Sequence, residues 1–155
     1  MADAATISIT ATMLPDEIAK TFSGSMIVTP DDANDKWYYK LTSVTTTSAI
    51  LIAGNYISQT AIAVGTGMTA VHGNDKVKFL FVQNTSTTDG MYMSFDNVAA
   101  VNSGVDNVFV GPSQTWFGRL PNTIVTNLLA ISSDIGDVGD ASITVLVAAL
   151  LDDVA

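Results

Sequence analysis

The only histidine of the chain, His72, is the residue best suited to acid–base or nucleophilic chemistry. It lies in the segment Val71-His72-Gly73-Asn74, which has the composition of a loop. A Ser-His-Asp arrangement also needs a positioned nucleophile, and the chain has no Gly-x-Ser-x-Gly segment to supply one. We therefore predict no catalytic residue and a protein that is not an enzyme. A small hydrolase built around His72 is an alternative that mutation of this residue would test.

Two groups of aspartates have spacings that could bring carboxylates together: Asp134, Asp137 and Asp140 in one, and Asp31, Asp32 and Asp35 in the other. Calcium takes about six to eight oxygen ligands, and such turns could supply some of them. Neither spacing matches an EF-hand loop, however, and aspartate is an ordinary residue of exposed turns. With one histidine and no cysteine, a structural zinc site is close to excluded. We predict that the protein binds no metal and no cofactor.

Three further patterns resemble functional motifs without carrying their chemistry. Gly65-Thr66-Gly67 lacks the lysine and the following helix of a phosphate-binding loop, so we expect a turn. Asn84-Thr85-Ser86 matches a glycosylation sequon, but nothing in the sequence indicates secretion. Acid pairs for glycoside hydrolysis are available among the many aspartates, yet none stands out beside aromatic residues.

Charge and composition narrow the class of partner. Fifteen Asp and Glu residues against six Lys and Arg residues give a formal net charge of −9. Nucleic acid and anionic lipid both attract cations, so we predict that the protein binds no nucleic acid and no membrane. Only 14% of the residues are charged, whereas nineteen Thr and thirteen Ser supply neutral hydroxyls. Hydroxyls cost less to desolvate than unpaired charges, which favours a surface made for permanent protein contact over a simple strand preference of Thr.

β-Rich segments predict a mainly β protein. Residues 77–82 and 91–95 flank a polar loop over 83–90, which is the pattern of a hairpin, and we expect this hairpin at the centre of an antiparallel sheet. The other expected strands are 5–12, 25–29, 37–47, one or two within 49–64, 105–110, 114–120, 124–132 and 143–150. Pro15 and the acids after it favour one short N-terminal helix over 14–22. We predict a single domain over 1–155, an antiparallel, jelly-roll-like β-sandwich, with a closed barrel as the alternative.

Two of the expected strands are apolar on both faces. Along 143–150 alternate residues face opposite ways, and Thr144 is the only polar member of either set; 124–131 is similar. A sandwich strand needs only one apolar face for its core. The other face must be covered by the short helix, by residues 49–64 or by another subunit. We favour subunit or partner contact, because burial at about 25 cal/mol per Å² gives a few such side chains several kcal/mol of association free energy.

The aromatic pair Trp116-Phe117, two residues before Arg119, allows two interpretations. Tryptophan and arginine are enriched at interface hot spots, so the segment could anchor a partner. Large aromatic residues also fill cores, and Trp116 inside the domain with Arg119 paired to an acid is the interpretation we favour.

Several runs carry a resemblance to a known class of proteins: NDKWYYK at 34–40, DKVKFLFVQN at 75–84 and WFGRLPN at 116–122, with 130–133 and 148–153. Over most of its length the chain resembles small virion structural proteins of tailed bacteriophages, especially those that infect marine cyanobacteria and other marine bacteria. The runs are structural signatures rather than catalytic motifs. The resemblance implies a component of the virion with no enzymatic residue to carry over.

Among virion roles, the size, β-rich build, acidic charge and Ser/Thr content favour a capsid decoration or cement protein. We expect it on the capsid surface, with the major capsid protein as its partner, and as a homo-oligomer, either a trimer or a dimer. A fibre would more often show repeats or a heptad stem, and the sequence has neither. The alternative is a tail- or head-fibre-associated β-sandwich that binds a receptor or a carbohydrate.

Overall fold

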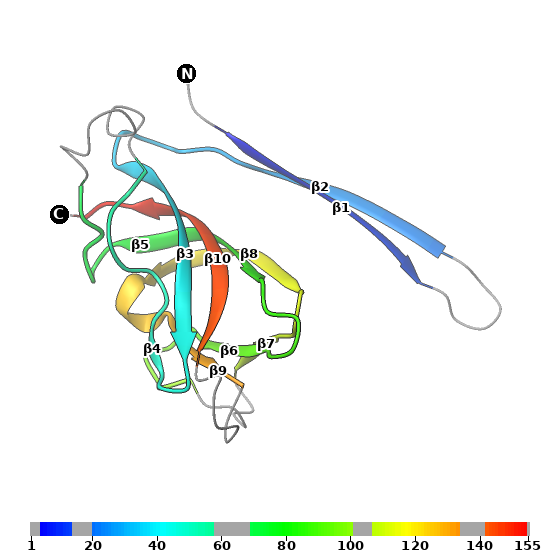
Figure 1. Cartoon of the computed structure of the whole chain (residues 1–155). Coiled ribbons are helices and arrows are strands. Elements are labelled where there is room, and N and C mark those ends of the chain that lie inside the picture. Colours follow the sequence, from blue (N-terminus) through cyan, green and yellow to red (C-terminus); the bar gives the residue numbers. More distant parts are fainter. Residues whose placement is uncertain (1–3, 14–19, 58–68, 101–106, 134–141, 155) are drawn as a thin grey trace. The chain divides into compact units, whose positions relative to one another are not determined.

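The computed structural model describes residues 4–13, 20–57, 69–100, 107–133 and 142–154, and these form an almost entirely β structure (Figure 1). The strands are β1 (Ala5–Met13), β2 (Lys20–Val28), β3 (Asp35–Thr45), β4 (Ala49–Ile50), β5 (Lys76–Asn84), β6 (Met91–Ser94), β7 (Val108–Val110), β8 (Thr115–Ile124), β9 (Leu129–Ser132) and β10 (Ser142–Asp152). A single turn of 3₁₀ helix, η2 (Val125–Asn127), precedes β9. The chain divides into two compact units, Met1–Ala33 and Asn34–Ala155.

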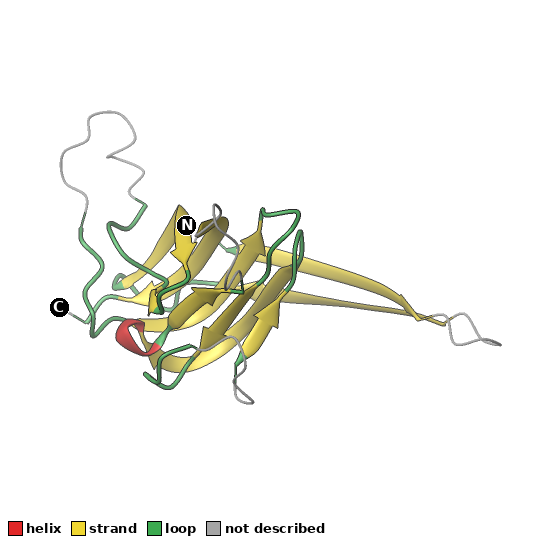
Figure 2. Ribbon diagram, turned by 60° about the horizontal axis from the view of Figure 1, so that its bottom comes forward, coloured by secondary structure: helices red, strands yellow, loops and turns green. Residues whose placement is uncertain are grey.

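The second unit is an antiparallel β-sandwich, as the sequence predicted. Its first sheet has the strand order β3-β10-β5-β8, and its second sheet has the order β4-β9-β6-β7. Figure 2 shows the two layers. Their inner faces share one hydrophobic core, to which β5 and β10 contribute Leu80, Val82, Val145 and Val147 and β6 contributes Met91 and Met93. The predicted single domain over 1–155 stays a prediction, because the sandwich itself is built from the second unit.

The first unit contains a two-stranded antiparallel hairpin, β1 and β2, which we call the arm. Its register pairs Ala5 with Val28 at one end and Met13 with Lys20 at the other. The predicted N-terminal helix is wrong for residues 20–22, which belong to β2, and its remaining part over 14–19 lies outside the described residues. The strand pairing provides a backbone hydrogen-bond ladder that a helix of two turns would not match, since so short a helix is marginal.

The predicted hairpin between residues 77–82 and 91–95 is also wrong. Both segments are strands, but β5 pairs with β10 and β8 in the first sheet, whereas β6 pairs with β9 and β7 in the second. The polar loop over 85–90 therefore crosses from one layer to the other. Because β5 is apolar on both faces and has partners on both edges, it is a central strand, as expected, and it has no edge left for β6.

The remaining strand predictions are right in place and less accurate in length. The predicted strand 143–150 falls within β10 and 5–12 falls within β1, whereas 37–47 extends two residues beyond the end of β3. Pro121 and Asn122 separate the expected strands 114–120 and 124–132, but both lie inside β8, an edge strand, where a missing backbone N–H can face away from the sheet. Residues 124–132 combine the 3₁₀ turn with β9, and the expected strand within 49–64 is reduced to β4 in the described residues.

The crossing loop is fixed by the buried side chain of Asn84, at the end of β5. Its Nδ2 group donates hydrogen bonds to the carbonyl oxygens of Asp89, at 2.7 Å, and of Gly111, at 3.0 Å. Its Oδ1 atom accepts a hydrogen bond from the Ser86 backbone N–H at 2.9 Å. Asn84 is only 1% exposed, so the sequon Asn84-Thr85-Ser86 presents no accessible amide for a glycan in the folded protein.

We expect the substitution Asn84→Ala to lower the free energy of unfolding by about 1–3 kcal/mol, because several buried backbone carbonyls lose their donor. Urea unfolding followed by circular dichroism measures this change. The exposed neighbour Gln83 provides a control on the same strand, and Gln83→Ala should change stability by less than about 0.5 kcal/mol. Equal effects of the two substitutions would contradict the anchoring role of Asn84.

Candidate assembly surfaces

The first sheet carries an apolar layer on the side opposite the core, which we call the outer face. Directly paired residues of antiparallel strands share a face, so the register defines its members. Between the pairs Trp37–Leu150 and Leu41–Leu146, they are Trp37, Tyr39 and Leu41 on β3; Leu146, Ala148 and Leu150 on β10; Phe79, Phe81 and Gln83 on β5; and Thr115, Phe117 and Arg119 on β8. Nine of these twelve residues are apolar or aromatic, Gln83 and Thr115 are polar, and Arg119 is the only charged one.

Burial varies across the outer face. Leu150 is 1% exposed and Phe79 is 3% exposed, although both point away from the core cluster. Tyr39 is 54% exposed and Leu41 is 58% exposed on the edge strand β3. The prediction that 143–150 is apolar on both faces is therefore confirmed. The sandwich accounts for one of these faces; on the other, Leu146 and Ala148 are half-buried and Leu150 is buried, and the exposed apolar side chains of the outer face belong to β3.

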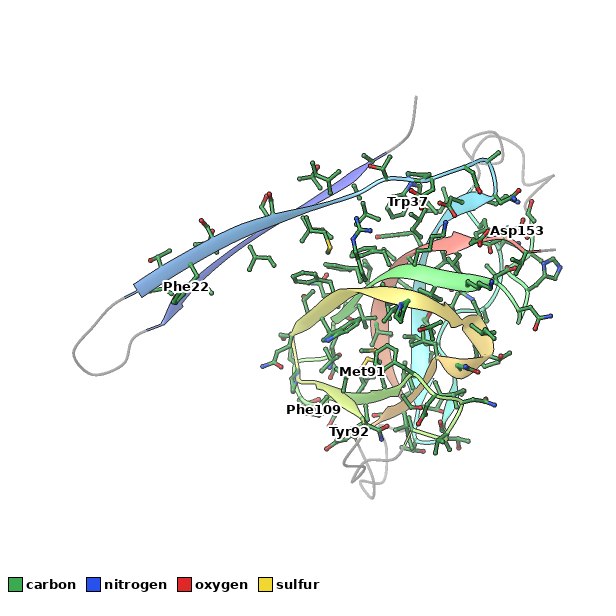
Figure 3. The ribbon with its side chains drawn as sticks, turned by 180° about the vertical axis from the view of Figure 1, so that it is seen from behind. Phe22, Trp37, Met91, Tyr92, Phe109 and Asp153 are labelled. Carbon is green, nitrogen blue, oxygen red and sulfur yellow. The ribbon has the colours of Figure 1, made fainter. Side chains whose placement is uncertain are left out.

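The second sheet has a smaller apolar row on its own outer side, which we call the aromatic row. It consists of Phe109 on β7, Tyr92 on β6 and Ile131 on β9, which are paired in register. The rings of Tyr92 and Phe109 lie 4.9 Å apart between centroids, and Phe109 is 50% exposed (Figure 3). The sequence analysis missed this pair, because the prediction joined β6 to β5 and so gave Tyr92 a different neighbour.

The absence of a side chain at Gly90 allows the Phe109 ring to pack against the backbone there. A Cβ atom on residue 90 would meet ring carbons of Phe109 at 2.4 and 2.5 Å, which is far inside van der Waals contact. The ring therefore packs directly over the backbone of residue 90. A side chain there would push Phe109 away from Tyr92.

The arm is amphipathic across its two faces. One face consists of the paired residues Ala5 and Val28, Ile7 and Met26, Ile9 and Gly24, and Ala11 and Phe22. The opposite face pairs Thr6 with Ile27, and its next pairs are all serines and threonines: Ser8 with Ser25, Thr10 with Ser23, and Thr12 with Thr21. Phe22 is 50% exposed and Ile9 is 43% exposed. The alternation within 5–12 predicted one side of this pattern, whereas the wrong helix assignment hid the other.

Trp116 and Phe117 fall on opposite faces of β8. Trp116 pairs with the core residue Val82 and packs against the core, with its ring 5.5 Å from that of Phe95. The interpretation of Trp116 as a core residue is therefore confirmed. Phe117 pairs with Phe81 and belongs to the outer face, while Arg119 is exposed at its border.

His72 lies in an exposed turn that is closed by the buried carboxylate of Asp75. The Oδ2 atom of Asp75 accepts hydrogen bonds from the His72 backbone N–H, at 2.7 Å, and from the Tyr56 hydroxyl, at 2.5 Å. The Oδ1 atom accepts one from the Val154 backbone N–H at 3.2 Å. Asp75 thereby joins the turn, Tyr56 and the C-terminal end of the described chain. A fully buried carboxylate requires this degree of hydrogen bonding.

The same region could in principle hold a metal ion, because ligand atoms of His72, Asp75 and Asp153 lie within 4.8 Å of one another. Each carboxylate already has protein partners, however. Asp75 accepts the three hydrogen bonds described above, and Asp153 forms an ion pair with Lys36. A metal ion would have to displace these groups, so the arrangement is better explained as a structural anchor.

Of the other groups singled out in the sequence, Asp134, Asp137 and Asp140, and also Gly65-Thr66-Gly67, lie outside the described residues. Asp31 and Asp32 are exposed in the first unit, whereas Asp35, at the start of β3, accepts a 2.9 Å hydrogen bond from Lys78 in the second. Asp35 is 8% exposed and serves as a partner of a β5 lysine.

A shallow polar depression lies where the crossing loop meets the start of β10. It is lined by Thr85, Ser86, Thr87, Thr88, Asp89, Ser142, Ile143 and Thr144. Hydroxyl groups dominate it, and several already bond within the loop, as Thr88 does to Asp89. None of its described lining residues is aromatic.

No protein-family model, curated protein or solved structure was found to match the chain. In the part of the chain that the structure describes, no helix has the length and hydropathy of a membrane span.

The buried Tyr56 predicts a specific pH dependence. Burial, and secondarily the hydrogen bond to Asp75 and its charge, raise the pKa of Tyr56 well above its ordinary value of 10.0. Folding thus favours the protonated phenol, so the stabilising contribution is fully present below about pH 10 and is lost as the pH rises above it, by up to about 1.4 kcal/mol per unit.

We expect Tyr56→Phe to be destabilised relative to the parent at pH 7, because Asp75 loses a donor, and this difference should shrink between pH 10 and 11. Urea unfolding at several pH values measures it. The exposed Tyr39 provides the control, since Tyr39→Phe should be close to neutral at pH 7. A parent–variant difference that grows above pH 10 would contradict the interpretation.

Proposed function

We propose that the protein is a non-enzymatic structural component of a bacteriophage virion, and that it acts as a decoration or cement protein that binds the outer capsid shell. The observation that carries this proposal is the presence of strands that are apolar on both faces. The outer face, the aromatic row and the apolar side of the arm all carry apolar residues in addition to those of the hydrophobic core. Exposed apolar strand surface of this extent is characteristic of proteins that assemble.

The polar chemistry of the described residues supports a structural role over catalysis. His72 contributes its backbone N–H to a turn, and Asp75 is engaged in three hydrogen bonds. Asp35 and Asp153 are paired with lysines. These groups hold loops and chain ends in place.

The aromatic row is the surface that we assign to the shell. Phe109 and Tyr92 are large, partly exposed and supported from below by a glycine, and rigid aromatic side chains of this kind contribute strongly at interfaces. The partner would be the major capsid protein. The hydroxyl-lined depression favours the alternative function, recognition of a carbohydrate or receptor by a tail- or head-fibre component.

The direct test is binding of the purified full-length protein to expanded phage heads. We expect saturable binding and increased resistance of the heads to heat and dilution. Phe109→Ser should weaken binding by roughly tenfold or more, as loss of an aromatic hot spot does. Val98→Ser is the control, because Val98 is 63% exposed but lies outside the aromatic row.

Absence of binding at saturating protein would overturn the decoration role. Binding to a glycan array, with loss of the signal in Asp89→Asn at the polar depression, would instead establish the carbohydrate-binding alternative. Equal effects of Phe109→Ser and Val98→Ser on head binding would leave the decoration role intact and contradict the assignment of the aromatic row to the shell.

A further inference from the structure

The arm cannot be explained as an independent structural element. A two-stranded hairpin is at best marginally stable in water unless its apolar side packs on something. The arm has such an apolar side, with Ile7, Ile9, Ala11, Met26 and Phe22 on it, and a Ser/Thr-rich side opposite. This division specifies which side must be covered and which side can face water.

The outer face of the first sheet has the matching chemistry. It has apolar side chains on all four strands, with Gln83 and Thr115 as polar members, and its exposed apolar residues Tyr39 and Leu41 lie on the edge strand β3. In the chain by itself, Phe22 and Ile9 of the arm are exposed as well. Both surfaces therefore have exposed apolar side chains, and every copy of the chain has both surfaces.

We propose that the arm of one copy packs with its apolar side on the outer face of a second copy, and that the arm of the second copy packs in the same way on the first. The result is a two-fold pair with exchanged arms. This inference concerns self-association and rests on the assembly role proposed above, but not on the identity of the shell protein or on the aromatic row.

The size of the arm favours reciprocal exchange over a one-sided contact. Each strand has nine residues. At about 3.4 Å per residue and about 4.8 Å between strands, one side of the arm measures roughly 30 by 10 Å, or about 300 Å². One arm on one sheet would bury about 600 Å² in total, which is half of the roughly 1,200 Å² at which stable interfaces begin. Two exchanged arms reach about 1,200 Å².

The arm offers a matched pair of substitutions that separates this proposal from a general loss of apolar surface. Ile9 lies on the apolar side, opposite Gly24, whereas Ile27 lies on the Ser/Thr-rich side, opposite Thr6. Both are exposed, at 43% and 59%. Ile9→Thr and Ile27→Thr make the same chemical change, and threonine preserves strand preference.

The oligomeric state of the full chain is measured by sedimentation velocity over a range of concentrations. We expect a dimer for the parent and for Ile27→Thr. Ile9→Thr should raise the dimer dissociation constant by roughly a hundredfold, since each of two arms loses about a tenfold contribution from one buried aliphatic side chain. The melting temperature of each variant checks that the sandwich, which has its own core, remains folded.

The absence of cysteine allows a second test that locates the contact. A chain carrying Ile9→Cys is mixed with a chain carrying Leu41→Cys, and a short bis-maleimide links thiols that lie close together. We expect a covalent pair made of one chain of each kind, and much less of it when Ile27→Cys replaces Ile9→Cys.

A monomeric parent, or an Ile9→Thr variant as dimeric as Ile27→Thr, would overturn the exchanged pair. A further chain that carries both Ile9→Cys and Leu41→Cys tests the alternative, because a crosslink that forms only within this chain would overturn the exchange in favour of an arm that covers its own sheet. Because head binding is measured separately, a monomer that still binds heads would refute the exchange and retain the decoration role.

Discussion

The constraint on which the rest of the structure depends is that a two-layer sandwich buries only one face of each sheet. In β10, Val145 and Val147 lie in the core, while Leu146, Ala148 and Leu150 face away from it. The same division holds for Leu80 and Phe81 on β5. Apolar surface removed from water contributes about 25 cal/mol per Å². Burial of the side chains on this face that remain exposed, such as Tyr39 and Leu41, therefore favours association. A protein that does not associate through this face ordinarily has polar residues at these positions, because antiparallel sheets commonly expose one polar face.

An assembly surface must also be rigid, and buried polar anchors supply this rigidity. Asn84 holds the loop between the two layers against the backbone of residues 89 and 111. The carboxylate of Asp75 accepts hydrogen bonds from the turn at His72, from the Tyr56 hydroxyl and from the C-terminal end of the described chain, and so holds the three together. Each anchor is a group that is expensive to bury unless its hydrogen bonds are made, and each therefore accepts only one arrangement of its neighbours. Ordered loops keep the strand registers defined. The registers in turn determine which residues form the outer face.

Local pattern predicted most strands but not which strands are neighbours. Alternation and β-branched content located β1, β3, β5, β8 and β10, since these features act residue by residue. Whether β5 pairs with β6 or with β10 depends on residues more than sixty positions apart, and the apolar character of 77–82 fits either partner. The helix expected over 14–22 came from Pro15 and the following acids, which are valid local signals, whereas Lys20–Val28 forms a ladder with β1. The apolar second face of 143–150 was predictable because period-two alternation depends only on the strand itself; the aromatic row was not, because it requires the pairing of β6 with β7.

The distribution of charge explains how such apolar surfaces coexist with a net charge of −9. Mutual repulsion between acidic copies acts over about 8 Å at physiological ionic strength, so it slows nonspecific encounters but does not oppose a contact whose own surface is neutral. Several carboxylates of the sandwich are used internally, as Asp35 is by Lys78 and Asp153 is by Lys36. The outer face defined above has one charged residue, Arg119, at its border, and the apolar side of the arm has none among its paired positions from Ala5 to Ala11. Association through these surfaces therefore requires no desolvation of unpaired charge, which is the term that most often cancels the gain from apolar burial.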